Sequence, residues 1–171
     1  MSAAGMKADL QEARPFAAHA PDRERPLGGY ALLISAFLAC AGGFSAWLRR
    51  SNRQLPERVT PGDLALITVA SHKASRLLAK DRVTSTVRAP FTRFQEDGAA
   101  GEVEEEARGS GLQRAIGELV TCPYCLGLWI SAGFNAGLVV APRVTRFSAA
   151  LLAVTSGSDT LQILYKRLEG T

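Results

Sequence analysis

Charged and apolar residues are strongly segregated along this chain. No charged residue occurs between Arg25 and Arg49, or between Glu118 and Arg143. A helix crosses the hydrocarbon core of a bilayer with about 20 residues, at roughly 1.5 Å of rise per residue. The two gaps therefore predict membrane-spanning helices at residues 28–48 and 126–141.

Two further helices are expected from the same pattern. Residues 147–165 contain a single charge, Asp159, and are followed by basic residues that can anchor the end of a third span. The sequence Thr60-Pro61 with Asp63 in the first turn predicts a helix from Asp63 to about Lys80. Only its first half is apolar, so it is expected to be slanted or to lie at the membrane surface, with a fourth span as the alternative.

The predicted fold is all-α: a small integral membrane helical bundle with three spanning helices plus one amphipathic or slanted helix. Residues 1–27 mix prolines with both signs of charge, which predicts a mobile N-terminal tail. Residues 28–48 form an extra N-terminal transmembrane helix, and residues 63–167 form the membrane domain. Residues 81–120, with the acidic run 102–106, are interpreted as a solvated loop, and no strand pattern is recognised.

The distribution of basic residues predicts the orientation. Of the 20 Lys and Arg residues, 14 fall on one side of the predicted bundle and 6 on the other, whether or not residues 63–80 cross. By the positive-inside rule, the long loop and the C-terminus are cytoplasmic, and only the side of the N-terminus stays open. The expected location is the cell membrane, with the lipid bilayer as a partner, and no feature indicates nucleic-acid binding.

The sequence Thr121-Cys122-Pro123-Tyr124-Cys125 directly precedes the second apolar segment. Its two sulfurs lie one turn apart at a helix start, where the helix N-terminus favours a thiolate at Cys122. One interpretation is a thiol-disulfide protein in which Cys122 is the nucleophile and Cys125 the resolving thiol. The tetrapeptide matches the active site of glutaredoxins, but that motif follows a strand, which this chain does not predict.

Metal binding is the second interpretation of this pair. Structural zinc usually needs four ligands, and Cys122 and Cys125 supply two. His72 is the best additional candidate in the chain, and a homodimer is the other source of ligands. The third interpretation is that both cysteines are small packing residues at a helix entry, and the sequence leaves all three open.

Small residues predict how the last two helices pack. Gly133 and Gly137 form a Gly-x-x-x-Gly pattern, and a stripe on the next helix consists of Ala149, Ala153 and Gly157. A connector of about four residues makes these helices antiparallel neighbours, so the stripes are expected to face each other. Asp159 would then face the bundle near the cysteine end, in a polar site shared with the cysteines and His72, or in a simple polar contact between helices.

Several ordered blocks resemble one known family. The blocks are His72-Lys73-Ala74-Ser75-Arg76-Leu77, Arg88-Ala89-Pro90-Phe91-Thr92, Gly101-Glu102-Val103-Glu104-Glu105, and Gly117-Glu118-Leu119 followed by the cysteine motif and Trp129. Over about residues 63–167, this pattern is similar to the bacterial family called domain of unknown function 1360. Some members carry a sporulation-protein label. The resemblance implies a small bacterial integral membrane protein, and it carries over no catalytic residue.

These observations favour a non-enzymatic membrane component that assembles with itself or with another membrane protein. The alternatives are a thiol-disulfide redox protein and a metal-binding membrane protein, both of which use the same cysteine pair. Composition agrees with a membrane protein, because the average apolar fraction of 47% conceals two long uncharged segments. Three cysteines are too few for a scaffold held by disulfides.

Overall fold

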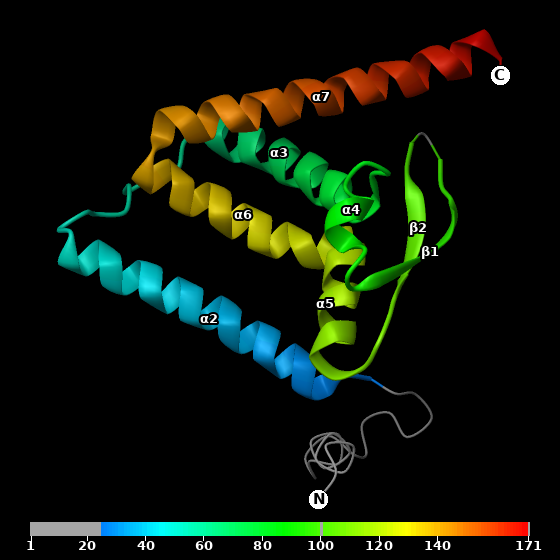
Figure 1. Ribbon diagram of the computed structural model, residues 1–171. Helices are drawn as coiled ribbons and strands as arrows, with labels where there is room; N and C mark the ends of the chain where they lie inside the picture. The colour runs from blue at the N-terminus through cyan, green and yellow to red at the C-terminus, as the bar shows by residue number, and fades with distance from the viewer. Residues whose placement is uncertain (1–24, 100, 171) are drawn as a thin grey trace, which may run out of the picture.

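The computed structural model describes residues 25–99 and 101–170 (Figure 1), so nearly all of the expected N-terminal tail lies outside the described residues. The described part is mostly helical. Its helices are α2 (Leu27–Arg50), α3 (Pro61–Lys80), α4 (Ser85–Arg88), α5 (Gly111–Thr121), α6 (Pro123–Val140) and α7 (Pro142–Glu169). Its strands are β1 (Thr92–Asp97) and β2 (Val103–Ala107), which pair as an antiparallel hairpin.

The four long helices alternate in direction (Figure 1). Helices α2 and α6 start near α5 and the β-hairpin, and α3 and α7 run back toward that end. We call this the hairpin end. The opposite end, where α2 and α6 finish and α3 and α7 begin, is the arginine end; its arginines are Arg49, Arg50, Arg53, Arg58, Arg143 and Arg146.

Helix α3 lies between α6 and α7 and packs along both of them. Besides Asp63 and Ile67, the residues that it buries are small ones, Ala70, Ser71, Ser75 and Ala79. Small side chains let helix backbones approach closely, as in membrane helix pairs. Its start agrees with the sequence signal, since the Thr60 hydroxyl accepts a hydrogen bond from the Asp63 amide at 3.1 Å.

The β-hairpin corrects the expectation of an all-helical chain. The acidic run is not a solvated loop, because most of it forms strand β2, which packs on α5. A Cβ atom added at Gly117 of α5 would lie 2.5 Å from the Phe91 carbonyl oxygen and 2.8 Å from the Ala107 Cβ. Only glycine allows α5 to approach the hairpin this closely.

Among the described residues, two helices are long and apolar enough to cross a bilayer: Leu27–Arg50 and Pro123–Val140. The third predicted span is not among them. Its residues lie inside α7, which starts earlier than expected, at Pro142, and leaves only Ala141 as a connector. Serine, threonine and glutamine side chains make α7 too polar to count as a span by composition alone.

Candidate functional site

The cysteine pair lies at the junction of α5 and α6. Cys122 separates the two helices, and its sulfur accepts a hydrogen bond from the Cys125 amide at 3.2 Å. Cys122 thus caps the first turn of α6, in the way that serine or threonine usually does. Both thiols are free, with Cys125 exposed and Cys122 half-buried.

The structure does not place the other candidate ligands beside these cysteines. His72 is exposed on α3. Asp159 of α7 instead forms an ion pair with Lys73 of α3, with 2.5 Å between the Lys73 Nζ and Asp159 Oδ2 atoms. Within residues 25–99 and 101–170, no three His, Cys, Asp or Glu residues are grouped so that they could hold a metal ion. The redox and zinc interpretations therefore stay predictions.

The cap predicts how Cys122 responds to substitution. Cys122→Ser should leave the thermal midpoint of the solubilised protein unchanged, because a serine hydroxyl accepts the same hydrogen bond. Cys122→Ala should cost about 1 kcal/mol, which lowers Tm by about 2–4 °C. Cys125→Ala is the matched control, since its side chain is not the cap. Equal loss in the serine and alanine variants would contradict the capping role.

The predicted small-residue stripes on α6 and α7 meet only at one corner. A Cβ atom added at Gly137 would lie 2.6 Å from the Thr145 Oγ1 atom, and Ala149 is fully buried. A Cβ atom added at Gly133 or Gly157 would meet nothing within 4 Å. The two helices therefore diverge beyond the corner, because α3 lies between them and supplies the small residues.

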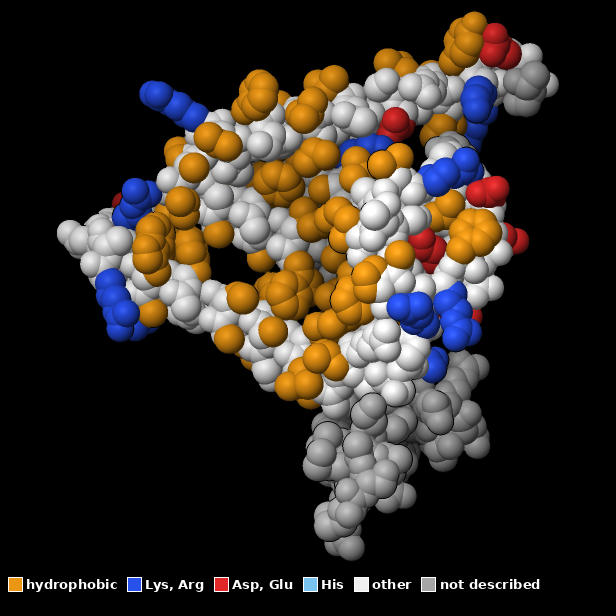
Figure 2. Space-filling view, in the orientation of Figure 1, with side chains coloured by type: hydrophobic (Ala, Val, Ile, Leu, Met, Phe, Trp, Pro, Cys, Tyr) orange, Lys and Arg blue, Asp and Glu red, His pale blue; other side chains and the backbone are white. Residues whose placement is uncertain are grey.

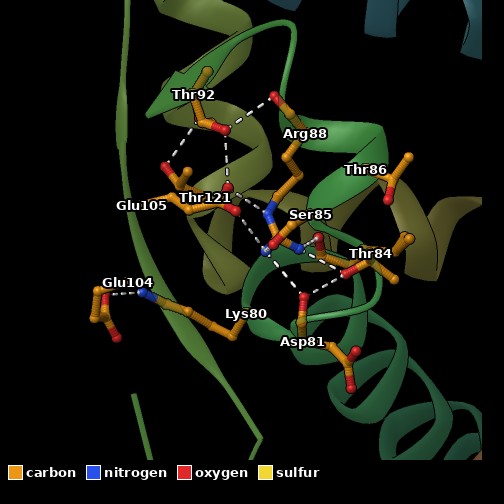
Figure 3. A network of polar contacts seen from close by, with 12 residues as sticks. Lys80, Asp81, Thr84, Ser85, Thr86, Arg88, Thr92, Glu104, Glu105 and Thr121 are labelled. Carbon is orange, nitrogen blue, oxygen red and sulfur yellow. Dashed lines mark hydrogen bonds and ion pairs between the residues drawn. The ribbon is translucent and has the colours of Figure 1, made fainter. Parts of the chain in front are cut away.

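A buried ion pair joins the β-hairpin to the helices (Figure 3). Arg88 of α4 is only 1% exposed, and the Glu105 side chain of β2 is 5% exposed. The guanidinium binds the carboxylate with both ends, with Nε to Oε2 at 2.8 Å and Nη2 to Oε1 at 3.2 Å. The Thr92 hydroxyl of β1 donates to the same carboxylate at 2.9 Å.

The remaining guanidinium hydrogens are also used. Nη1 donates to the Leu78 carbonyl oxygen at 2.7 Å and to the Thr84 hydroxyl at 2.6 Å. Nη2 also lies within hydrogen-bond distance of the Asp81 carbonyl oxygen and the Ser85 hydroxyl, both at 3.0 Å, so its two hydrogens serve three acceptors including Glu105. Arg88 therefore binds the last turn of α3, α4 and β2 together. Because all of its donors have partners within the chain, we interpret the cluster as an anchor.

An outer row of ion pairs follows the same interface. Arg76 binds Glu102 through Nη2 at 2.5 Å, and Lys80 binds Glu104 at 2.6 Å. With Lys73 and Asp159, these contacts use the whole basic face of α3. This face therefore holds the hairpin and α7.

The anchor affects the acidity of Glu105. Burial alone would raise the pKa of its carboxyl group, but hydrogen bonds from Arg88, Ser85 and Thr92 outweigh burial and hold the pKa below the ordinary range. The stabilisation from Glu105 is complete above the pKa of the unfolded chain, about 4.3, and is lost as the pH falls through the lower pKa of the folded chain.

We therefore expect acid to weaken the hairpin selectively. The difference in Tm between the wild type and Glu105→Gln should be largest at neutral pH and should shrink below about pH 4. Glu106→Gln, at an exposed position of the same strand, is the control and should show no such trend. A difference that is constant from neutral to acidic pH would contradict the lowered pKa.

Comparisons with known proteins identify a family for this chain. The family model described as "Protein of unknown function (DUF1360)" matches residues 66–165. The chain belongs to this family. It is also 26% identical over 107 residues to a protein named Sporulation protein YjcA from Bacillus subtilis (strain 168), covering 61% of this chain and 91% of that protein. No solved structure matches.

The family match covers the anchor, the cysteine junction and the Lys73–Asp159 pair, and it leaves α2 outside. It confirms the resemblance found in the sequence. The anchor itself was missed, although Val103, Glu105 and Ala107 alternate along β2 as strand residues with one buried face do. That alternation is a local signal of the strand, but it spans too few residues to identify the hairpin or its anchor.

Proposed function

We propose that this chain is a non-enzymatic integral membrane protein that assembles with itself or with another membrane protein. One observation carries the proposal: only 6% and 0% of the residues in the apolar stretches of α2 and α6 are fully buried, and most residues of α2 are exposed. Exposed apolar surface of this extent is typical of contact with lipid or with another protein. The name of the similar protein YjcA mentions sporulation, and it names no chemical reaction.

The proposed topology has all four long helices crossing the membrane. It is supported by the packing of α3 along both α6 and α7, because helices that pack side by side along their lengths can cross the same layer together. The N-terminal segment, the β-hairpin and the C-terminus then share one side. That side carries most of the basic residues, so we propose that it faces the cytoplasm.

The proposed assembly surface is the outer face of α7. Leu151 and Val154 are 63% and 72% exposed there, whereas Ala149 on the inner face is fully buried. A helix with one face packed on its own chain and one apolar face uncovered suits contact with a second membrane helix.

Cysteine cross-linking in native membranes tests this proposal. In a chain whose three native cysteines are replaced by serine, Leu151→Cys should give oxidative dimers or adducts, and Ala149→Cys should give none. Alkaline carbonate extraction of the same membranes should leave the chain in the pellet. Release by carbonate would contradict membrane insertion, and a carbonate-resistant chain without adducts would contradict assembly through α7.

A further inference from the structure

The middle of α2 is separated from α6 by a hollow. At the hairpin end, α2 is held by Tyr30, whose hydroxyl donates to Glu118. At the arginine end, Arg53 just beyond α2 donates to the Val139 and Val140 carbonyl oxygens of α6, both at 3.3 Å. Figure 2 shows the hollow between these fixed ends, bordered by apolar side chains.

One aromatic contact divides this hollow in two. The rings of Phe37 and Trp129 meet edge to face, with 5.1 Å between their centroids. A cavity of about 400 Å³ lies toward the hairpin end, and a larger one of about 680 Å³ lies toward the arginine end. Both volumes are in the range of ligand sites.

The polar residues at the two cavities differ in charge. The smaller cavity reaches Glu118, which already has Tyr30 and Arg114 as partners. The larger cavity is lined mainly by apolar residues of α2 and α6, and it reaches Arg58 and the Arg146–Asp63 pair.

The arginine end of the larger cavity is cationic. Arg58 forms no ion pair within the described part of the chain. Residues 49–60 carry four arginines and a single acid, Glu57. An apolar cavity with a cationic end complements an amphiphile that has an anionic head.

We propose that the larger cavity binds an acyl chain of an anionic phospholipid whose phosphate lies against Arg58. The inference rests on the proposed membrane function, because the bilayer supplies the lipid. A helix from a second copy is about 10 Å across and cannot enter without breaking the contacts that hold both ends of α2. An acyl chain is thin enough to lie between them.

The two tryptophans of the chain permit a direct test. Trp129 borders the cavity, and Trp47→Phe leaves it as the only tryptophan while keeping an aromatic ring near Arg53. The full chain with this substitution is placed in phosphatidylcholine vesicles. Trp129 fluorescence is then measured as phosphatidylglycerol or phosphatidylcholine, each brominated on its acyl chains, is added. Half-quenching should need about fivefold less of the anionic lipid, the equivalent of about 1 kcal/mol for one basic residue.

Two variants locate the binding site. Arg58→Gln should abolish the preference for phosphatidylglycerol. Arg143→Gln, at the same end but outside the cavity lining, should retain it. Gly133→Leu should reduce quenching by both lipids, because this glycine borders the cavity and has open space around it. Loss of the preference in both arginine variants would show general surface attraction and would overturn the site.

Flotation of the same vesicles distinguishes a failure of the proposed membrane function from a failure of the lipid site. A chain that does not float with the vesicles contradicts the proposed membrane function and the lipid site together. A chain that floats but is quenched equally by both lipids contradicts the lipid site alone. Absence of quenching by either lipid, with energy transfer between differently labelled copies, would assign the cavity to a second copy and overturn the proposal.

Discussion

Replacing Arg88 with methionine should lower the free energy of unfolding of the β-hairpin by about 3–5 kcal/mol. This is the usual cost of removing one partner from a buried ion pair, because the other charge is left without compensation. Glu105 would retain its carboxylate in a position where its side chain is only 5% exposed. The variant also removes the contacts of the guanidinium with the end of α3 and with α4.

Hydrogen exchange of the β2 amides in the solubilised full chain measures this effect, because it reports local opening as a free energy. Arg93→Met is the matched control, since Arg93 is exposed on β1 and should change protection by less than about 0.5 kcal/mol. The double variant Arg88→Met with Glu105→Met removes both charges and should recover most of the lost stability. A single variant as stable as the control would show that the pair does not anchor the hairpin.

The sequence predicted α2, α6 and the start of α3, because each is recognisable from residues within the helix or directly before it. The two uncharged segments correspond to α2 and α6, because a span of apolar residues is recognisable within its own sequence. The start of α3 was also recognisable, because Thr60 and Asp63 form the cap within four residues. Neither prediction required knowledge of what lies beside the helix.

The hairpin and the anchor could not be found in this way. Glu105 turns inward only because Arg88, 17 positions earlier in the chain, is held there by the end of α3. In the sequence alone, four glutamates within five residues look like solvated loop, and strand β2 has only five residues. Val103, Glu105 and Ala107 share one face of this strand, but a pattern of this length is too short to outweigh that composition.

The sequence predicted that small residues let the helices pack closely, but it did not predict which helices they join. Small residues do allow close approach, but the stripe lies on α3, where Ser71, Ser75 and Ala79 alternate with basic residues on the neighbouring face. The sequence pattern had instead assigned the small-residue contact to α6 and α7. The position of Asp159 depended on that assignment. Asp159 pairs with Lys73 of α3, which is a polar contact between helices, and the polar site shared with the cysteines and His72 stays a prediction.

Asp159→Leu should destabilise the bundle more than Lys73→Met. The Lys73 side chain is 19% exposed and that of Asp159 is 45% exposed, so the lysine is the partner that reaches water less easily when left alone. In the proposed topology α3 crosses the membrane, where an uncompensated charge costs about 2.5–3.5 kcal/mol. For a chain of this size, Asp159→Leu should lower Tm by about 5–14 °C.

The order of three variants tests whether the pair acts as a unit. Lys73→Met should show a smaller loss than Asp159→Leu, and the double variant Lys73→Met with Asp159→Leu should be more stable than either, because it leaves no charge without a partner. Glu169→Leu, at the exposed end of α7, is the control and should leave Tm unchanged. Additive losses in the double variant would contradict the pairing of α3 with α7 through these side chains. A recovery would indicate that Lys73 and Asp159 act as a unit in the interface where α3 packs along α7.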